Sequence, residues 1–486
     1  MPSTQRPLVD ALLTRSASTT LSEQLAQRYA ERIRQRLLAD GARLPSVRES
    51  ARRHGVSPST VVDAYEQLQA QGLVQAKPQR GFFVRADTPS APAETQGNLA
   101  RSRHAAPRPA PADATALIRS MFQAQGGLPA PGMGTLPEAW LDAPLLQRAL
   151  RRATTGDAAA ASWLRYGEPA GDAGLRAALS RRLAELGVRA AASQIVTTVG
   201  ATHALDIVSR TLLRPGDAVL VDEPGWAVEF ARLARLGMRV LPVPRGPEGP
   251  DLAVMEALLK AHRPRLYVTV SVLHNPTGAS LSPAAAHQVL RLAEQHDLTL
   301  VEDDTYAWLA PPHATRLSQL DALRRTVYIS GFSKILTPQW RVGFMAASPA
   351  LADKLIDTKL LSTLSTAAPL EQAAAWCLDQ GALRRHAERV TALLDAARAR
   401  SVHLATHAGC RFVAPPQGLF GWVDVGMDTE SLAQTMLDDG WLIAPGTLFH
   451  ATPRPTSLMR INFGTAQDAR FWQRLRRARQ DTTSHI

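Results

Sequence analysis

One stretch of this 486-residue chain cannot contribute to a packed core. Residues 87–115, DTPSAPAETQGNLARSRHAAPRPAPADAT, are rich in proline and alanine and contain one large apolar residue, Leu99. A segment of this composition, without apolar periodicity, is typical of a linker, which as a flexible coil would span roughly 30 Å. We therefore expect two separately folded parts, a head of residues 1–86 and a body of residues 116–486.

Positive charge is concentrated in the head. Residues 1–86 carry 13 Lys and Arg against 7 Asp and Glu, a net charge of +6, and the whole chain carries +12. Half of the excess charge therefore lies in less than a fifth of the chain. This asymmetry favours a polyanionic partner for the head, with a solvated charged surface as the alternative on charge alone.

The composition excludes several classes of protein. With 45% hydrophobic and 20% charged residues, the chain has the balance of a globular protein. We find no run of about 18 apolar residues, and the N-terminal residues lack the apolar stretch of a signal peptide, so no membrane partner is expected. Cys377 and Cys410 are too few for a disulfide framework or a structural zinc site. We expect a cytoplasmic protein without a metal centre.

The head contains the start signals of three helices. Thr20 and Glu23 have capping-box spacing, as do Ser46 and Glu49. A third helix is expected to begin at Ser57, because serine is a good N-cap and the proline that follows it suits the first helical turn. The apolar residues of this third helix recur at helical spacing. They are Val61, Ala64, Tyr65 and Leu68.

The second and third helices are joined by a tight turn, and a hairpin follows them. Only His54, Gly55 and Val56 separate the two helices, which is typical of a helix–turn–helix. After Gly72 the chain reads LVQA, KPQRG and FFV, which predicts two short strands around a turn that carries Lys77 and Arg80. Such a hairpin is the wing of a winged helix–turn–helix domain.

From Leu21 to Val84 the head closely resembles the GntR family of winged DNA-binding domains, most clearly in the run ARLPSVRESARRHGVSPSTVVDAYEQLQAQGLVQAKPQRGFFV. Hydroxyl and backbone N–H groups at a helix N-terminus suit phosphates, and the recognition helix of such domains enters the major groove of double-stranded DNA. One departure is Pro58, which stands where many relatives carry an arginine, so one contact to DNA is missing. A three-helix domain for protein contacts is the alternative. The resemblance implies that the DNA-facing residues are Arg48, Ser57, Ser59 and Thr60, with Arg80 and Gly81 on the wing.

The body alternates helix-like segments with short apolar strands. This alternation predicts an α/β fold, a mostly parallel sheet with helices on both faces. After about residue 365 the helices become longer and the strands scattered, which predicts a smaller C-terminal lobe (about 365–486). The predicted strands are SQIVTTVG, DAVLVDEP, RVLPVP, RLYVTVSVLHNP, LTLVEDDTY, TVYISGFS and RVGFMAAS, followed in the lobe by GLFGWVDV and LMRINF.

Lys334 is the first candidate for chemistry in the body. It lies in YISGFSKILTPQWRVGF (328–344) and is one of only five lysines in a chain that otherwise uses arginine. A desolvated primary amine condenses with an aldehyde, which a guanidinium does not do. Arg341 follows seven residues later, as in a phosphate-holding loop. A lysine and a phosphate site together indicate pyridoxal 5′-phosphate (PLP). The other lysines are expected to be solvent-exposed: Lys77, Lys260, Lys354 and Lys359.

The other groups that PLP requires are also present. The ring nitrogen requires a carboxylate, which LTLVEDDTY supplies at a strand end as Asp303 or Asp304. Asn275, in HNPTG, can hydrogen-bond to the phenolic oxygen, and Trp226, in DEPGW, offers an aromatic face. Each motif is weak alone, but together and in this order they are specific. The phosphate requires donors at a helix N-terminus, which are expected at Gly200, Ala201 and Thr202.

With these motifs, residues 116 to about 475 resemble a fold-type I aminotransferase. The resemblance implies that Lys334 forms the Schiff base and that Asp303 pairs with the ring nitrogen, with Asp304 as the alternative because spacing does not separate the neighbours. It implies that Tyr306 and Asn275 reach the phenolic oxygen. The residues implied for the phosphate cup are Ala201, Thr202, Ser333 and Arg341.

Two further roles and one departure come from the same resemblance. Tyr166, in YGEPAGDAGLR, is similar to the tyrosine that is donated across a dimer interface to the partner's phosphate, and Arg460, in MRINFG, to the arginine that clamps a substrate carboxylate. The family usually has Ser or Thr three residues before the lysine, where this chain has Gly331. One phosphate hydrogen bond is therefore lost unless Ser330 or Ser333 replaces it.

A GntR-type head, a long linker and an aminotransferase-like body together resemble the MocR subfamily of bacterial regulators. The resemblance implies a homodimer that binds an operator in double-stranded DNA and senses an amine, an amino acid or PLP itself through an aldimine at Lys334. The principal alternative is a PLP-dependent aminotransferase with an accessory head, because lysine, carboxylate and carboxylate clamp are all present. A DNA-binding protein that has lost the cofactor is a third possibility. The complete DNA-reading unit favours a regulator that is not primarily an enzyme.

Overall fold

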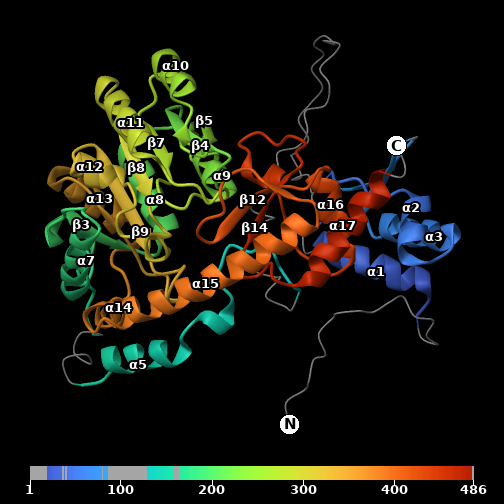
Figure 1. Cartoon of the computed structure of the whole chain (residues 1–486), viewed down its shortest axis with the longest axis horizontal. Coiled ribbons are helices and arrows are strands. Elements are labelled where there is room, and N and C mark those ends of the chain that lie inside the picture. The colour runs from blue at the N-terminus through green and yellow to red at the C-terminus, as the bar shows by residue number, and fades with distance from the viewer. Residues whose placement is uncertain are drawn as a thin grey trace, which may run out of the picture. The chain divides into compact units, whose positions relative to one another are not determined.

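The computed structural model forms two compact units, one within residues 1–129 and one spanning residues 130–486 (Figure 1). The predicted linker, 87–115, and the predicted start of the body lie outside the described residues, so the domain boundaries stay predictions. Within the described part of the chain, no helix is long and apolar enough to cross a membrane. The structure describes residues 19–34, 38, 41–78, 80–85, 128–156 and 164–483, with side chains to residue 480.

The head is a winged helix–turn–helix, as predicted. Ser46 Oγ accepts from Glu49 N–H (3.3 Å) and Ser57 Oγ accepts from Thr60 N–H (3.2 Å), so the predicted N-caps are formed. Gly55 makes the turn between the two helices. The strands pair antiparallel. The elements are α1 (Leu21–Arg34), α2 (Val47–His54), α3 (Pro58–Ala70), β1 (Val74–Lys77) and β2 (Gly81–Val84).

The apolar face of α3 is the centre of the head's core. Its four predicted residues, from Val61 to Leu68, have no exposed surface. Tyr65 packs edge-on against Tyr29 of α1 and Phe82 of β2, with ring centroids 5.7 and 5.1 Å apart, and its hydroxyl donates to the carbonyl of Pro45 (2.9 Å). This packing fixes the exposed N-terminus of α3 relative to the wing.

The body is built on an eight-stranded sheet of order β3-β10-β9-β8-β7-β4-β5-β6. The pairs β5–β4, β4–β7, β7–β8 and β8–β9 are parallel, which confirms the predicted mostly parallel sheet. β10 is antiparallel to both neighbours, and β6 pairs antiparallel with β5. The strands are β3 (Ile195–Thr198), β4 (Ala218–Glu223), β5 (Arg239–Gly246), β6 (Gly249–Pro250), β7 (Leu266–Thr269), β8 (Thr299–Asp303), β9 (Thr326–Gly331) and β10 (Gly343–Ala346).

Helices cover both faces of this sheet (Figure 1). Val219 and Val221 of β4 pack in one cluster with α8, α9 and α13, whereas Leu220 packs in another with α10 and α11. Neighbouring strand residues therefore face opposite helical layers, which explains why the strands are apolar throughout rather than alternating. The helices are α7 (Ala173–Glu185), α8 (Ala201–Leu212), α9 (Ala227–Arg235), α10 (Leu252–His262), α11 (Pro283–Gln295), α12 (Leu317–Asp321) and α13 (Pro349–Thr363).

The C-terminal part contains a second sheet, of order β11-β12-β14-β13, in which every pair is antiparallel. α14 (Ala368–Asp379) packs against α5 (Ala143–Thr154) and α7, so the first helix after residue 365 joins helices from the N-terminal half of the body (Figure 1). The remaining strands and α-helices are β11 (Arg411–Phe412), β12 (Phe420–Asp424), β13 (Ala444–Pro445), β14 (Leu458–Asn462), α15 (Ala382–His407), α16 (Thr429–Asp438) and α17 (Ala469–Thr483).

Candidate functional site

Lys334 follows strand β9 in a part-buried position. Its Nζ donates a 2.6 Å hydrogen bond to the carbonyl oxygen of Gly134. Burial lowers the pKa of Lys334 to about 8, and the charges of Arg460 and Arg341 act in the same direction, while Asp303 opposes them. A lysine with this pKa is neutral in a useful fraction of molecules near pH 7, as attack on an aldehyde requires.

The two neighbouring carboxylates have different surroundings. Asp304 is fully buried and accepts from Arg316 Nε (2.6 Å) and the Tyr328 hydroxyl (2.9 Å). Asp303, at the end of β8, accepts from the backbone N–H and the hydroxyl of Thr305 and interacts electrostatically with Lys334. Asp304 is therefore committed to an internal ion pair, and the geometry favours Asp303 as the carboxylate of the pocket.

Asp303 is held in an environment that disfavours its charge. Burial raises its pKa to about 6, although the hydrogen bonds from Thr305 lower it. The neighbouring Asp304 and Glu229 carboxylates raise it further. A cation placed beside Asp303 would relieve this penalty, because an opposite charge favours the ionised carboxylate.

Arg460, on β14, is a buried guanidinium with an incomplete set of partners. Its Nη1 donates to Asn275 Oδ1 (2.8 Å) and its Nη2 to the carbonyl of Gly132 (2.7 Å), whereas Nε has no hydrogen-bond partner. The guanidinium lies 4.5 Å from the ring centroid of Phe420 and 4.9 Å from that of Phe449. Burial lowers its pKa to about 10, so it stays charged at neutral pH and can bind a carboxylate.

Tyr306 belongs to the same group of side chains. It is buried, and its ring lies edge-on to that of Phe420 with centroids 5.5 Å apart. Burial raises the pKa of its hydroxyl, Arg460 opposes this and Asp303 adds to it. The structure thus gathers Lys334, Asp303, Tyr306, Asn275 and Arg460 around one region of the body.

The predicted phosphate cup lies where α8 begins. Gly200 precedes Ala201 with a positive φ of 78°, and a Cβ at this glycine would collide with Nη2 of Arg341. Arg341 Nη1 donates to Ser333 Oγ (3.1 Å) and Nη2 to the carbonyl of Val199 (3.3 Å). The N-terminus of α8, a hydroxyl and an arginine therefore meet in one place, as an anion site requires. Thr202 is part-buried in the first turn of α8.

At Gly331, where the family usually has Ser or Thr, a side chain would lie close to the backbone of neighbouring segments. A Cβ at this glycine would lie 3.1 Å from the Val342 carbonyl oxygen and 3.9 Å from the backbone nitrogen of Ala201. Ser330 cannot supply the missing hydroxyl, because it is buried and donates to the carbonyl of Asp304 (2.8 Å). Ser333, already beside Arg341, is the remaining candidate.

Within the described part of the chain, no hydrogen bond, ion pair or ring contact joins two of the predicted residues, Trp226 and Tyr166, to this group. Trp226 is part-buried at the start of α9 and packs against the cluster around α8. Tyr166 is 86% exposed. An exposed aromatic side chain of this size is compatible with a role at an interface, which the single chain does not test.

Three residues of this region were missed or misread from the sequence. The expectation of an exposed Lys359 is wrong: the side chain is fully buried, and Nζ donates to the hydroxyls of Thr197 and Thr366 (both 3.3 Å). It shares the buried stripe of α13 with residues 352 and 355, and this helical spacing could have revealed it. No local signal predicts the roles of Arg316 and Asn462, because Asp304 and the carbonyl groups of residues 131–135, which they bind, lie in other parts of the chain.

The predicted DNA-facing residues lie on the surface of the head. Arg48, Ser57, Ser59, Arg80 and Gly81 are exposed, and Thr60 is part-buried. Ser57 Oγ also lies within hydrogen-bonding distance of Ser59 Oγ (2.7 Å) and Thr60 Oγ1 (2.8 Å), which places three hydroxyls at the start of α3.

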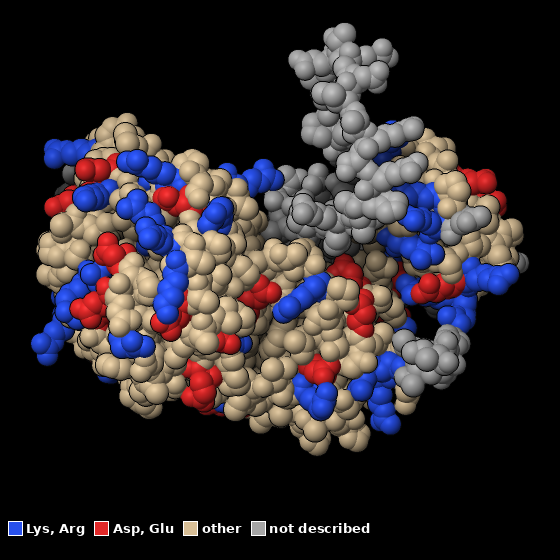
Figure 2. All heavy atoms as spheres, turned by 90° about the horizontal axis from the view of Figure 1, so that it is seen from above, with Lys and Arg blue, Asp and Glu red and all other residues tan. Residues whose placement is uncertain are grey.

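One basic residue beside the wing was missed. The backbone of Arg43 forms an isolated antiparallel β-bridge with Phe83, and its side chain lies against Gly81. Arg43 therefore brings another guanidinium to the wing. On the face of the body drawn in Figure 2, Lys and Arg are interspersed with Asp and Glu rather than gathered in one patch. The hydroxyls, Arg48 and the wing therefore make the head the candidate nucleic-acid interface.

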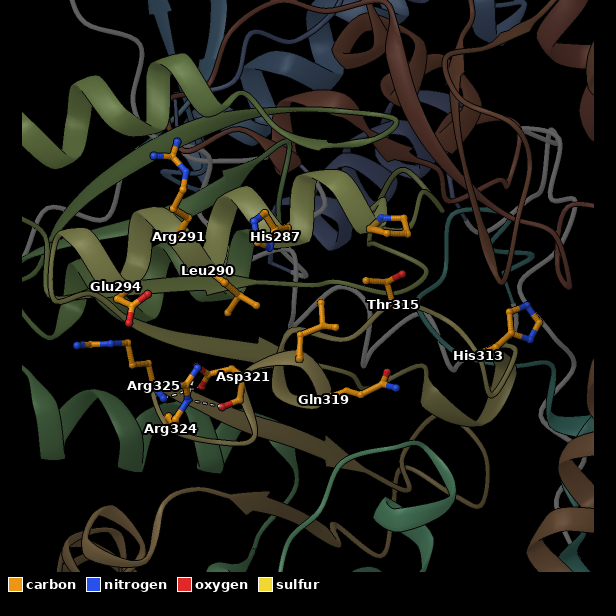
Figure 3. A pocket seen from close by; sticks show the side chains of 12 residues that line it. His287, Leu290, Arg291, Glu294, His313, Thr315, Gln319, Asp321, Arg324 and Arg325 are labelled. Carbon is orange, nitrogen blue, oxygen red and sulfur yellow. Dashed lines mark hydrogen bonds and ion pairs between the residues drawn. The ribbon is translucent and has the colours of Figure 1, made fainter.

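A separate hollow of about 930 Å³ lies between α11, α12 and the loop that carries His313 (Figure 3). None of the residues predicted to bind PLP lines it. Two of its arginines already contact carboxylates, Arg325 with Asp297 (2.6 Å) and Arg324 with Asp321 (3.9 Å). This hollow is not part of the candidate site.

Comparisons with known proteins match the body and the head to two different families. The family "Aminotransferase class I and II" matches residues 134–472, and "Bacterial regulatory proteins, gntR family" matches residues 21–84. The HTH-type transcriptional regulator YdcR of Escherichia coli is 30% identical over 454 residues, which cover 90% of this chain and 94% of that protein. The 2-aminoadipate transaminase of Thermus thermophilus is 31% identical over 351 residues, 70% of this chain and 84% of that protein.

A solved structure supports the fold of the body. The α-aminoadipate aminotransferase LysN of Thermus thermophilus, complexed with N-(5′-phosphopyridoxyl)-L-leucine, is similar with a TM-score of 0.68. It is 26% identical and covers 76% of this chain and 95% of its own. The predicted fold, an aminotransferase-like body with a winged head, is confirmed.

Proposed function

Because this chain belongs to the HTH-type regulators that join a GntR-type head to a class I and II aminotransferase domain, the MocR architecture, we propose that it is a PLP-dependent transcriptional regulator. The head would bind an operator in double-stranded DNA, and the body would sense an amine, an amino acid or PLP itself. The observation that carries the proposal is Lys334, which lies with lowered pKa among the groups that PLP requires.

The residues of the body fit PLP. Lys334 would bond covalently to the cofactor's aldehyde carbon, Asp303 would hold a negative charge beside the ring nitrogen, and Tyr306 and Asn275 would donate to the phenolic oxygen. The buried, unpartnered Nε of Arg460 supports a ligand carboxylate at that guanidinium. When bound, PLP supplies an aldehyde for amines and a ring that withdraws electrons from them. The phosphate would be held by Gly200, Ala201, Thr202, Ser333 and Arg341, with Trp226 against the ring.

Each of these side chains has a task in ligand binding. Arg460 binds and orients a carboxylate through parallel N–H groups, which favours amino acids over plain amines. Lys334, with a pKa of about 8, accepts and returns a proton at Nζ near neutral pH. Asp303, whose pKa is raised to about 6, gains most from a cationic neighbour.

A homodimer is part of the proposal. Tyr166, exposed in the single chain, would complete the phosphate cup of the partner subunit. Two heads held on one dimer would then bind two half-sites of an operator. Ligand binding in the body would change the affinity of the heads for DNA by an allosteric coupling.

The second candidate function is an aminotransferase with an accessory head. The observation that favours it is that Lys334, Asp303 and Arg460 lie in one region of the body, together with the similarity to a 2-aminoadipate transaminase. A pocket that binds an amino acid for sensing needs the same groups as one that transaminates it. The two functions are therefore separated by measurement of turnover and of DNA binding in one preparation.

The test is an absorbance titration of the purified protein, combined with operator binding. PLP should produce an absorbance band that borohydride fixes to Lys334, and Lys334→Ala should abolish the fixed adduct without loss of the fold. Addition of the sensed amino acid should shift the band and change operator affinity. Turnover to a keto acid with no change in operator affinity would favour the aminotransferase, and an adduct on another lysine would overturn the site.

A further inference from the structure

The segment that opens the body lies along strand β14. We call residues 130–136 the arm; in Figure 1 it is part of the teal chain beside β12 and β14. Asn462, fully buried on β14, holds the arm at alternate residues. Its backbone N–H donates to the carbonyl of Pro131 (2.7 Å), and its Nδ2 donates to those of Met133 (2.8 Å) and Thr135 (2.7 Å).

The two carbonyl groups in between face the candidate site. Gly132 O accepts from Nη2 of Arg460 (2.7 Å), and Gly134 O accepts from Nζ of Lys334 (2.6 Å). Hydrogen bonds from charged donors are about twice as strong as neutral ones. The arm is therefore fastened on one side by an asparagine and on the other by the lysine and arginine to which the proposed function assigns ligands.

A cofactor and a ligand at the site would compete with the arm for both charged donors. When an amine condenses with an aldehyde, a C=N bond forms and the carbonyl oxygen leaves as water with two protons from the nitrogen. An ammonium group at Lys334 thus keeps at most one proton, and the cofactor's phenolic oxygen competes for it. At Arg460, a ligand carboxylate carries a full negative charge and outcompetes the neutral carbonyl of Gly132.

We propose that the arm reports the state of the site: PLP at Lys334 takes the donor of Gly134 and loosens the arm, and a ligand carboxylate at Arg460 takes the donor of Gly132 and loosens it further. This inference rests on the proposed function and deepens it by naming the element that responds. Asn462 would act as a positioning residue that sets the closed state. Along the chain, the arm follows the residues that connect the body to the head, so its opening would add the arm's own residues to that connection.

A thiol placed in the arm would measure its opening. Leu136 is 5% exposed and packs in the body's core, so Leu136→Cys gives a thiol that is protected while the arm is closed. The native thiols give little background, because burial raises the pKa of Cys377 to about 12 and that of Cys410 to about 11. The rate of alkylation by iodoacetamide is then measured in the full chain, stripped of cofactor and again with PLP.

PLP should raise the alkylation rate of Leu136→Cys by about tenfold or more, since a hydrogen bond from a charged donor is lost. Lys334→Ala, which lacks the same donor, should show the raised rate with and without PLP. If PLP absorbance appears and the rate stays unchanged, the inference is overturned and the proposed function stands. If no PLP absorbance appears, the proposed function fails and the inference with it.

A second variant opens the arm without any ligand. A Cβ at Gly132 would lie 2.5 Å from the backbone nitrogen of Ala444, so Gly132→Ala, made in the Leu136→Cys protein like its control, should push the arm off the sheet. Gly246→Ala is the matched control, because its added Cβ meets only one atom, at 4.0 Å. Rapid alkylation in Gly132→Ala alone supports the close approach of arm and sheet, and slow alkylation in both variants overturns it.

Discussion

Exchange of two adjacent aspartates for asparagine should have opposite effects on stability. Asp304→Asn is expected to destabilise the body strongly, and Asp303→Asn to stabilise it above pH 6. The contrast follows from their partners: Asp304 is paired with Arg316, and Asp303 faces the candidate site with hydrogen bonds from Thr305.

The magnitude for Asp304 comes from its buried ion pair. Asp304 and Arg316 have no exposed surface, and their closest atoms are 2.6 Å apart. Asparagine keeps an oxygen for the Tyr328 hydroxyl but leaves the guanidinium without a counter-charge. Removing one partner of such a pair costs about 3–5 kcal/mol of the free energy of unfolding.

The magnitude for Asp303 comes from its raised pKa of about 6. The folded protein binds this proton more tightly than the unfolded chain, in which the pKa is about 3.9. The charged form therefore costs at most about 3 kcal/mol above pH 6, and this cost disappears as the pH falls towards 4. Asp303→Asn removes the cost, so its stabilising effect should shrink over the same range.

The assay is thermal unfolding of the cofactor-free protein and of each variant between pH 5 and pH 8, followed by PLP binding. Asp303→Asn should have the higher midpoint at pH 8 and a PLP adduct that stabilises negative charge less well. Asp304→Asn should bind PLP normally where it is folded. If Asp304→Asn is stable while Asp303→Asn unfolds, the roles of the two carboxylates have been assigned in reverse.

Four more outcomes are expected. Because the pKa of Lys334 is lowered to about 8, the rate of its reaction with PLP should rise with pH up to about 8 and then level off, as stopped-flow absorbance would show. Because burial lowers the pKa of Lys359 to about 8, Lys359→Met should have a higher free energy of unfolding than the wild type at neutral pH. The free energy of unfolding of the wild type should rise between about pH 8 and pH 10, where Lys359 loses its proton, and thermal unfolding at each pH would show the difference shrink. Operator binding should weaken steeply with salt, and Arg48→Ala should cost about 1–3 kcal/mol if Arg48 reaches a base edge; unchanged affinity and a flat salt response would favour an accessory head. Residues 1–86 alone should bind the operator far more weakly than the full chain, because the proposed homodimer would bring two heads to one operator; equal affinities would show that the body does not organise the heads.

Local sequence signals were sufficient to predict the helices and strands of the head and most strands of the body. The N-caps at Ser46 and Ser57 and the apolar face of α3 involve residues three or four positions apart, so the pattern contains the whole interaction. The same holds for most strands of the body, whose apolar runs coincide with observed strands. β10 was found as a strand, but its antiparallel direction depends on neighbours far along the chain.

The candidate site was predictable only in its residue types. Spacing could not separate Asp303 from Asp304, because Arg316, which occupies Asp304, lies in a different element. The sequence does not decide whether Ser330 replaces the hydroxyl that is missing at Gly331. The structure excludes this, because the side chain of Ser330 points to the carbonyl of Asp304. The contacts of Lys334 and Arg460 with the arm join residues about 200 and 330 positions apart, and nothing in a glycine-rich segment marks its carbonyl groups as acceptors.

Successive carbonyl groups of the arm bind partners on opposite sides. The chain before the arm and the arm itself should therefore differ in how well they tolerate insertions and deletions. Insertions or deletions before Pro131 change only how much chain separates the arm from the head. A single residue gained or lost between Pro131 and Thr135 would exchange the two sets of carbonyl groups, so that those meant for Asn462 would face Lys334 and Arg460. Among related chains, the length of the segment upstream of the arm should therefore vary freely, while the five positions from Pro131 to Thr135 keep their number.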